Sequence, residues 1–429
     1  MEEPVFVEPA RLAIGMFVVL DLSWLEHPFS FNSFVIRSED ELATLRALGL
    51  EKIRIDPSRG TGITVPAAVE KPPALLAAVP EAAPEAAPAA VTRSDQELRI
   101  EHNRVLRSSI ANAEKQAAIA VRSVRQSTRQ FLVEPGQAIE QANALITGIA
   151  ESLLGNSEVM VHLLGDKGSD DEVYHHSLNV AVLALILGKA MELDSEALQS
   201  VGVAAVFHDV GMAELPSRVR LQSENLTQAE EALLRKHCEL GAGMALHSGL
   251  SKAVACAILQ HHEHLDGSGY PNRLSGEQIG RAARIIAIVN HYDHLCNPAK
   301  AAAVTPYEAL STMFARNRSW FDAAMLTKLV HVLGVYPPGS IVQLSSGDTA
   351  MVISVNSARP LRPMLLVYDA LIPKAEAIIL DLEQAPQISI SKALRAGSLP
   401  PPVNEYLSPR KRVAYFFGDG ACADSDKES

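Results

Sequence analysis

The stretch SKAVACAILQHHEHLDGSGYP, Ser251 to Pro271, begins as an apolar helical run and ends in a glycine-rich turn, with two adjacent histidines where they meet. The chain has only 14 histidines, and two buried neighbouring imidazoles would compete for the same hydrogen-bond partners. Metal ligation is the chemistry that favours neighbouring imidazoles. The stretch therefore predicts a pair of metal ligands at the end of a helix, with further ligands elsewhere in the chain.

The sequence around this stretch predicts a mainly α fold whose centre is a helical bundle. Residues 156–335 alternate apolar helical runs with short polar loops, which is typical of such a bundle. A helical connector over residues 94–155 precedes it, interrupted by the EPG sequence at 134–136. We expect this connector to be a packed helix pair; a dimerising coiled coil is the alternative, but the heptad pattern is poor.

The two ends of the chain have a different character. Residues 1–64 contain the strand-like runs FVVLDL and EKIRID around a helical segment, which predicts a small α/β module. Residues 65–93 are rich in Ala and Pro and indicate a linker. Short β-type runs over residues 336–390 predict a small β-rich appendage, and residues 391–429 are expected to be a partly disordered tail.

Composition limits the classes of function. The net charge of −12 argues against a polymeric nucleic acid as partner, since such a partner requires a basic face. The four cysteines are scattered without a C-x-x-C pair, as expected of reduced thiols. The N-terminus lacks a signal-peptide pattern, and no apolar run reaches the roughly 20 residues of a membrane span. We therefore expect a cytoplasmic protein without membrane insertion.

Metal-competent side chains recur along the predicted bundle. Glu172 and His176 are spaced i, i+4 on one helix face, and in VFHDVGM the glycine is expected to end the helix that carries the histidine and aspartate. Each residue taken alone is more often a surface or core residue than a ligand, and His175 is interpreted in that way. Together they favour a multinuclear Fe or Mn site, because a structural zinc site normally closes at four ligands. The candidates are Glu172, His176, His208, Asp209, His237, His261 and His262.

These motifs resemble a known family. HHSLNV, HDVG, the spaced His237 and above all HHEHLDGSGYP are similar to the HD-GYP domain, a subgroup of the HD metallophosphohydrolases. The resemblance covers residues from about 140 to 335 and the YPPGSIVQL segment that follows. Residues 5–60, with GMFVVLDLSWLEHPF and IRIDPSRG, also resemble a module of unknown function that often precedes HD-GYP domains.

The resemblance implies an all-helical domain with a two- or three-metal centre that hydrolyses cyclic di-GMP to the linear dinucleotide or to GMP. It adds Asn290 to the ligands named above and makes His208 and Asp209 the catalytic pair, with the Asp209 carboxylate able to bridge two cations. Glu263 and Asp266 would orient the imidazoles and the loop. Gly267, Gly269, Tyr270 and Lys300 would contact substrate, with Tyr270 offering a ring face and a hydroxyl.

Three departures from the family pattern lie in this site. Met212 stands where the family has a lysine, which removes a cation facing phosphate. Asn290, in AIVNHYDHL, replaces an aspartate ligand by a neutral amide, and Asp293 one turn later matches a second family aspartate that cannot simply replace the first. A basic stretch after that helix is here NPAKAAA, which leaves Lys300 as the nearby cation.

Two hypotheses for function follow, and a third is less favoured. The first is a metal-dependent phosphodiesterase that acts on cyclic di-GMP, supported by the intact histidine and aspartate ligands. The second is a receptor or scaffold that binds metal or nucleotide without cutting it, supported by Met212 and Asn290. The third is an HD hydrolase of another nucleotide, which the glycine-tyrosine loop disfavours. A homodimer or a signalling protein is the partner that either of the first two would use.

Overall fold

The computed structural model divides the chain into two compact units, Met1–Ala90 and Val91–Ser429. The residues that it describes are 5–20, 33–36, 38–47, 50, 52–56, 93–155, 159–162, 172–221, 226–298, 303–355, 361–370, 372, 374, 377–385, 388–395, 398–407 and 414–417.

The first unit is a small antiparallel sheet with one helix, as the strand-like runs near the N-terminus predict. Its strands are β1 (Val5–Val7), β2 (Phe17–Val19), β3 (Ser33–Val35) and β4 (Ile53–Ile55), in the order β1-β4-β2-β3. The short helix η1 (Pro9–Arg11) and the helix α1 (Glu39–Ala47) complete the unit. Its buried core includes Leu12, Val18, Ile36, Leu45 and Ile53. The predicted linker lies outside the described residues except for Arg93, where α2 begins.

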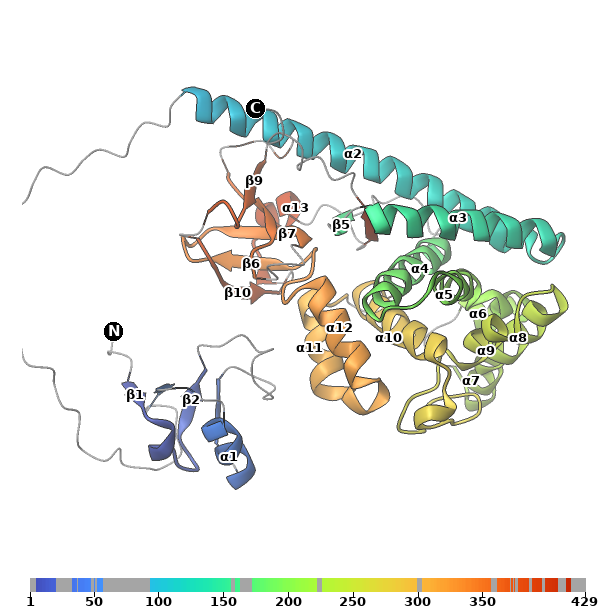
Figure 1. Cartoon of the computed structure of the whole chain (residues 1–429), viewed down its shortest axis with the longest axis horizontal. Coiled ribbons are helices and arrows are strands. Elements are labelled where there is room, and N and C mark those ends of the chain that lie inside the picture. The colour runs from blue at the N-terminus through green and yellow to red at the C-terminus, as the bar shows by residue number, and fades with distance from the viewer. Residues whose placement is uncertain are drawn as a thin grey trace, which may run out of the picture. The chain divides into compact units, whose positions relative to one another are not determined.

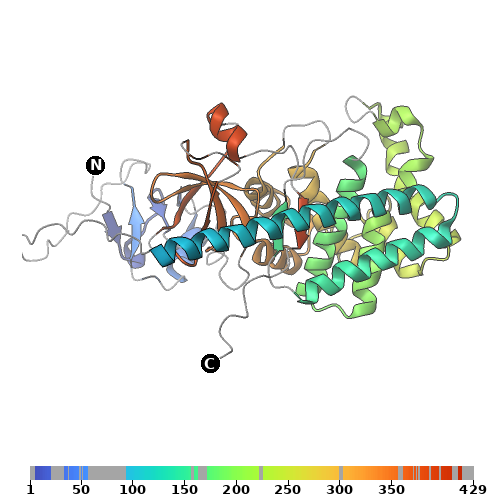
Figure 2. The same ribbon diagram turned by 90° about the horizontal axis from the view of Figure 1, so that it is seen from above.

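The second unit opens with a helix pair. α2 (Arg93–Gln130) and α3 (Pro135–Gly155) lie side by side in opposite directions (Figures 1 and 2). Proline is tolerated at the first position of a helix, so Pro135 starts α3 where it would have broken a continuous helix. The buried positions carry mostly small side chains, which allow close approach of the two helices: Ala113, Ala117, Ala120, Val124, Ala138 and Ala142. The pair packs as predicted.

A helical bundle follows and confirms the mainly α fold class. α4 (Glu172–Ala190) is its central helix, because every residue from Ser177 to Gly188 is buried. The helices around it are α5 (Ser195–Phe207), α8 (His237–His247), α9 (Lys252–Gln260), α10 (Arg281–Cys296) and α12 (Ala323–Leu333). Three further helices, α6 (Ser217–Leu221), α7 (Gln228–Arg235) and α11 (Pro306–Arg316), lie at its margins (Figure 1). Among the described residues, no helix combines the length and apolar character needed to cross a membrane.

A second antiparallel sheet lies beside the bundle. Its central path is β10-β6-β7-β5-β11, and β8 joins β7 to β9. The strands are β5 (Val159–His162), β6 (Ile341–Leu344), β7 (Thr349–Val355), β8 (Met364–Val367), β9 (Ile378–Asp381), β10 (Ile390–Leu394) and β11 (Ala414–Phe417).

Parts of this sheet come from segments that the sequence analysis assigned elsewhere. β5 lies in the segment assigned to the bundle, while β11, the helix α13 (Pro401–Leu407) and most of β10 lie in the segment assigned to the tail. Composition gives little warning, because short strands are held by backbone hydrogen bonds to partners far away in the sequence. β5 pairs with β11 and β7, and β10 pairs with β6.

Candidate metal centre

Helix ends bring the predicted ligands together. Asp209 follows α5 and precedes the short helix η3 (Val210–Glu214), His237 is the first residue of α8, and His261 directly follows α9. Gly211 permits this arrangement, since a Cβ at that position would meet the backbone of His237 and Gly241. The glycine therefore serves close approach of η3 to α8. We had expected this glycine to end the helix that carries His208 and Asp209. That prediction is wrong, because α5 has already ended at Phe207.

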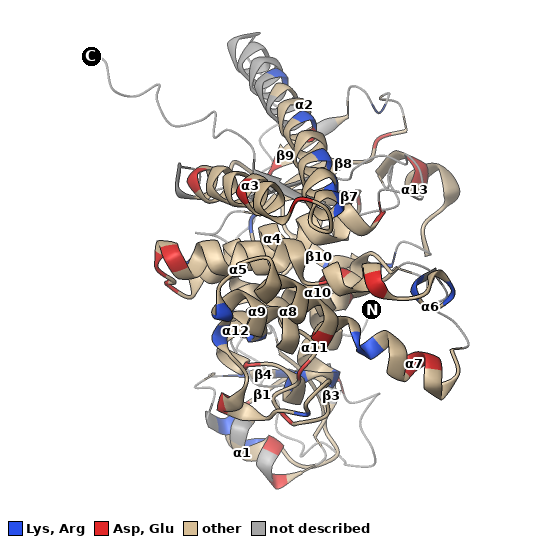
Figure 3. Ribbon diagram, turned by 90° about the vertical axis from the view of Figure 1, so that its right-hand side faces the viewer, with Lys and Arg blue, Asp and Glu red and all other residues tan. Residues whose placement is uncertain are grey.

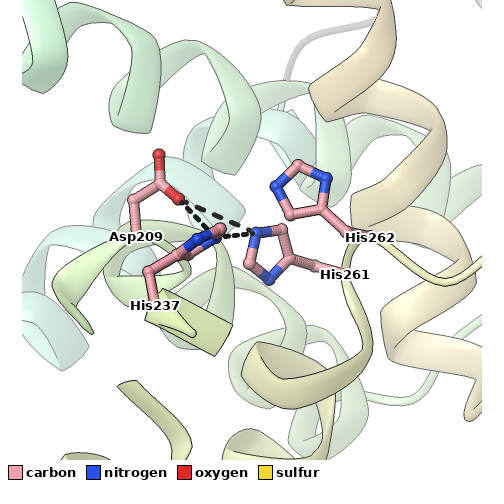
Figure 4. A group of neighbouring side chains, drawn as sticks. All are labelled: Asp209, His237, His261 and His262. Atoms are coloured by element: carbon pink, nitrogen blue, oxygen red, sulfur yellow. Dashed lines mark hydrogen bonds and ion pairs between the residues drawn. The ribbon is translucent and has the colours of Figure 1, made fainter. Parts of the chain in front are cut away.

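The candidate ligands form two groups that share one carboxylate. The His237 group consists of Asp209, His237, His261 and His262, and the His176 group consists of His176, His208 and Asp209. Within each group the possible ligand atoms all lie within 4.8 Å of one another. Figure 4 shows the His237 group, with the imidazoles of His237 and His261 turned toward Asp209.

Hydrogen bonds fix which ring nitrogen of each histidine faces the centre. The Nδ1 atoms of three of them donate to main-chain carbonyls one turn earlier: His208 to Ala205 at 2.7 Å, His237 to Leu234 at 2.8 Å and His261 to Ile258 at 2.7 Å. The Nδ1 of His176 lies 2.7 Å from a carboxylate oxygen of Asp293. A carbonyl can only accept, so the proton lies on Nδ1 and a neutral ring presents the lone pair of Nε2.

These Nε2 atoms converge on the carboxylate of Asp209. Its Oδ1 lies 3.3 Å from His237 Nε2 and 3.7 Å from His261 Nε2, and its Oδ2 lies 3.4 Å from His208 Nε2. Two ligands about 2.1 Å from one cation are separated by about 3.0–3.4 Å at octahedral or tetrahedral angles. The separations of 3.3 and 3.4 Å lie in this range and that of 3.7 Å is slightly longer, and the carboxylate directs one oxygen toward each group.

In two pairs of histidines the Nε2 lone pairs face each other, which also indicates a cation between them. The Nε2 atoms of His176 and His208 are 3.3 Å apart, as are those of His237 and His261. Oδ1 of Asp209 is buried and has no hydrogen-bond donor among the described residues. Unshared lone pairs that face one another without a proton between them repel, whereas a cation held between them would be attracted by all of them. The donor set therefore fits divalent metal binding.

The protonation states of these side chains also favour metal binding. Burial lowers the pKa of His208 to about 3, lowers that of His237, and lowers that of His262 well below its usual value. Burial alone would raise the pKa of Asp209, but His208, His261 and His237 hold it well below its ordinary range. Neutral imidazoles and an ionised carboxylate are the forms that ligate metals.

Asp293 holds the His176 group in place through the Nδ1 atom of His176. Its buried carboxylate receives, besides His176, the side-chain amides of Asn179 at 2.9 Å and Asn297 at 2.8 Å. Burial by itself would lower the pKa of His176, but the hydrogen bond to Asp293 and its charge raise it. Asp293 therefore strengthens His176 as a ligand and holds its ring in place. The sequence analysis noted Asp293 but did not assign it this role.

Asn290 and His294 lie one helical turn apart on α10, next to His176. Asn290 is buried, and its Oδ1 has no hydrogen-bond partner among the described residues, although its side chain helps to raise the pKa of His176. The ring of His294 packs edge-on against that of His176, with centroids 4.5 Å apart. The sequence analysis missed His294, for which the available signal was its position one turn after Asn290 in NHYDH.

The glycine-rich loop after His262 is held by carboxylates. A Cβ at Gly269 would overlap the backbone of His262, Glu263 and His264. The buried carboxylate of Glu263 accepts the backbone N–H groups of Asn272 at 2.6 Å and Leu274 at 2.9 Å. Glu263 therefore orients the loop, while the Nδ1 atoms of His176, His208, His237 and His261 have the other partners given above.

Asp266 ties the same loop to the following part of the bundle. Its carboxylate accepts from the Ser268 hydroxyl at 2.6 Å and from the Ser319 hydroxyl at 2.8 Å. The ring of His264 stacks on Trp320, with centroids 4.2 Å apart and 8° between the planes. These contacts fix the loop to the turn between α11 and α12, so Asp266 also acts on the loop alone.

Tyr270 lies in a stack of three side chains. Its ring stacks on His262 with centroids 4.6 Å apart, and the Arg235 guanidinium carbon lies 5.1 Å from the ring centroid. The Tyr270 ring is therefore in contact with both an imidazole and a guanidinium. Whether its ring or its hydroxyl contacts substrate remains a prediction.

Besides Asn290, Gly269 and Tyr270, three further predicted residues are not part of the two groups. Glu172 begins α4 one turn before His176 but lies outside both. Lys300 lies outside the described residues. Gly267 has a positive φ of 78°, which a glycine adopts without strain, so its part in the loop is conformational.

Family models match both units. One described as an HD domain matches residues 156–325, and one described as a domain of unknown function (DUF3391) matches residues 7–142. The second match extends from the N-terminal sheet into α2 and α3, well beyond the small N-terminal module expected from the sequence.

Curated relatives carry a consistent description. A cyclic di-GMP phosphodiesterase of Pseudomonas aeruginosa is 33% identical over 369 residues, which cover 83% of each chain. A cyclic di-GMP phosphodiesterase response regulator of Xanthomonas campestris is 32% identical over 152 residues, or 34% of this chain and 40% of that one. Among solved structures, a HDG"Y"P protein from Bdellovibrio bacteriovorus gives a TM-score of 0.41 at 14% identity, over 77% of this chain and 99% of that one.

Proposed function

This chain belongs to the HD-GYP family of HD-domain phosphodiesterases, and we propose that it hydrolyses cyclic di-GMP to the linear dinucleotide or to GMP. One observation carries the proposal: four imidazoles with anchored Nδ1 atoms direct their Nε2 atoms at the centre in which Asp209 lies. A structural site normally closes at four ligands, whereas the two groups here offer six side chains. A relative at 33% identity bears the name of the same activity.

The two groups would each hold one divalent cation, with Fe or Mn as the metals that suit this mixture of imidazole and carboxylate. His237, His261 and His262 would bind one ion, His176 and His208 the other, and Asp209 both. Asn290 could add its amide oxygen beside His176, and Glu172 is the candidate for a third ion. When bound, such cations activate water and neutralise the charge that develops on a phosphate.

The chain's own residues do the rest of the work. Asp293 and the three main-chain carbonyls hold the imidazoles in one orientation, so little reorganisation is needed when substrate arrives. Glu263, Asp266 and Trp320 fix the signature loop at the rim. The Tyr270 hydroxyl is the group that this loop offers to a phosphate or ribose oxygen.

Hydrolysis of cyclic di-GMP by anaerobically purified protein, supplied with Fe(II) or Mn(II), tests the proposal. We expect turnover that is lost in Asp209→Ala together with bound metal, while His175→Ala retains both. Parallel assays with 3'3'-cGAMP would define the nucleotide preference, because 3'3'-cGAMP-specific phosphodiesterases of Vibrio cholerae are 31% and 28% identical over shorter stretches. Equal metal content in the Asp209 and His175 variants would contradict the ligand assignment.

A receptor that binds cyclic di-GMP without hydrolysing it is the second candidate. The buried amide of Asn290, where the family pattern has a carboxylate, favours it, since the His176 group loses one negative charge. A metal-loaded protein that binds cyclic di-GMP but releases no product would establish this function. The scattered cysteines, which form no C-x-x-C pair, support a cytoplasmic location for either role.

A further inference from the structure

We propose that Arg235 is a substrate-binding residue, whose guanidinium binds a phosphate oxygen of the cyclic dinucleotide at the rim of the Asp209 centre. The inference rests on the proposed function and adds a cation to it. The sequence analysis found this site short of cations, since Met212 replaces a lysine and NPAKAAA replaces a basic stretch. Arg235 was not among the candidates.

Arg235 lies close to the His237 group, both in the sequence and in space. It ends α7 and lies two residues before the ligand His237. Its guanidinium carbon lies 5.1 Å from the centroid of the Tyr270 ring, which also stacks on His262 at 4.6 Å and lies 6.4 Å from the ring of His237. The guanidinium thus packs on a ring that contacts two side chains of the His237 group.

The segments that carry Met212 and Arg235 pack against each other. Gly211 lies against the main-chain carbonyl of His237. Met212 is one residue after this contact in the sequence and Arg235 is two residues before it. Figure 3 shows a basic end of α7 next to the bundle and acidic residues earlier in the helix. Arg235 is therefore a cation on a segment that packs against the one in which the family lysine is replaced by Met212.

The guanidinium also remains available to a ligand. The Arg235 side chain is 46% exposed, and one terminal nitrogen pairs with Glu231, itself 52% exposed, at i, i+4 on α7. Exposed pairs of this kind contribute little and are readily exchanged. A guanidinium has five N–H donors in a planar fork that matches the oxygens of a phosphate, so binding one carboxylate does not exhaust it. Stacking on Tyr270 holds this fork in place.

Kinetics of the full chain loaded with Mn(II) test the assignment. Arg235→Met removes the charge but keeps an unbranched side chain, and Arg218→Met is the matched control, because Arg218 is also exposed and paired with a glutamate, Glu230 at 2.9 Å. We expect Arg235→Met to raise the KM for cyclic di-GMP about tenfold, as loss of one charge-assisted hydrogen bond does, with a smaller change in kcat and unchanged metal content. Arg218→Met should leave KM within about twofold.

Two further variants separate substrate binding from support of the fold. Glu231→Gln breaks the ion pair but keeps the guanidinium, so KM should stay the same or fall. Met212→Lys, added to Arg235→Met, should recover about threefold or more of the lost affinity by supplying a cation across the same contact. Recovery by a second cation would not occur if Arg235 only stabilised the loop.

The outcomes distinguish this inference from the proposed function. Equal KM values in the Arg235 and Arg218 variants, or a Glu231→Gln variant that reproduces Arg235→Met, would overturn the role of Arg235 while hydrolysis by the unaltered chain stands. A metal-loaded chain that neither hydrolyses nor binds cyclic di-GMP would overturn both.

Discussion

The two halves of the metal centre share Asp209 but are built differently. In the His237 group, helix ends alone orient the ligands His237 and His261, through hydrogen bonds to carbonyls of their own helical turns. In the His176 group, His176 lies in the first turns of a central helix and depends on the carboxylate of Asp293, 117 residues later. His208, in the second group, is held like His237 and His261, by a carbonyl of its own turn. The contrast between local sequence and tertiary packing therefore rests on His176. The departure at Asn290 lies in the second half.

Removing the shared carboxylate should have the largest effect, because it disables both halves. In Asp209→Ala we expect both cations to be lost and kcat/KM to fall by a factor of about 1000 or more, as in other centres that lose a central electrostatic group. Metal analysis and cyclic di-GMP hydrolysis measure this. His175→Ala is the control, and a variant at Asp209 that kept one firmly bound ion would mean that the two groups do not share it.

Disturbing only the second half should cost less. Asp293→Asn keeps the shape of the side chain but removes the charge that holds His176, and loss of such an anchor typically costs about 10–100-fold in metal affinity or activity. Titration with Mn(II) should then show one weakened ion and one unchanged ion. An equal loss of Mn(II) affinity at both groups would mean that Asp293 does not act on the His176 group alone.

Acid should destabilise the metal-free protein through histidines of both halves. The pKa values of His208, His237 and His262 are lower in the folded chain than the value of 6.5 expected when unfolded, so the unfolded state binds more protons below pH 6.5. Stability is therefore present above pH 6.5 and is lost as pH falls toward about 3. Between pH 6 and pH 5 we expect a loss of about 2 kcal/mol, measured by urea unfolding of chelator-treated protein.

The opposite shift of His176 does not cancel this loss. Its pKa is raised, so its contribution to stability is already complete below pH 6.5 and declines only at higher pH. Unfolding free energies that are equal at pH 6 and pH 5 would mean that the fold does not keep His208, His237 and His262 neutral. Their pKa values would then not differ in direction from that of His176.

The smallest expected change is a gain. Asn290→Asp would place a carboxylate beside His176, in the half that has lost a charge, and we expect metal affinity of that half to rise by several-fold, up to about tenfold. Competition with a metal indicator measures it, and Asn290→Ala should lower the affinity. If both variants behaved like the unaltered chain, the buried amide oxygen of Asn290 would have no part in ligation.

Local patterns made much of this predictable. The α2–α3 pair followed from Pro135 and an apolar stripe, and HH before a glycine loop placed His261 and His262 at the end of a helix. The structure gathers all six histidine and aspartate candidates from HHSLNV, HDVG, His237 and the signature into two groups. Whether each is a ligand remains a prediction.

Relations between distant residues could not be predicted in this way. Nothing near Asp293 in the sequence indicates that it bonds to His176, and nothing near Tyr270 indicates that Arg235 covers its ring. The strands β5 and β11 have four residues each, too few for the repeated apolar pattern that marks a longer strand. Among the described residues β11 pairs with β5, and β5 pairs also with β7. In each case the deciding partner comes from elsewhere in the chain.

The pairing of β5 with β11 has a consequence for how the protein is made. The first of these strands precedes the bundle and the second lies about 250 residues later, near the C-terminus. Because a ribosome delivers the chain from its N-terminus, the backbone edge of β5 that faces β11 stays unpaired until residues 414–417 have emerged. A nascent chain that stops before residue 414 exposes an open strand edge next to a finished bundle, which invites pairing with a neighbouring chain.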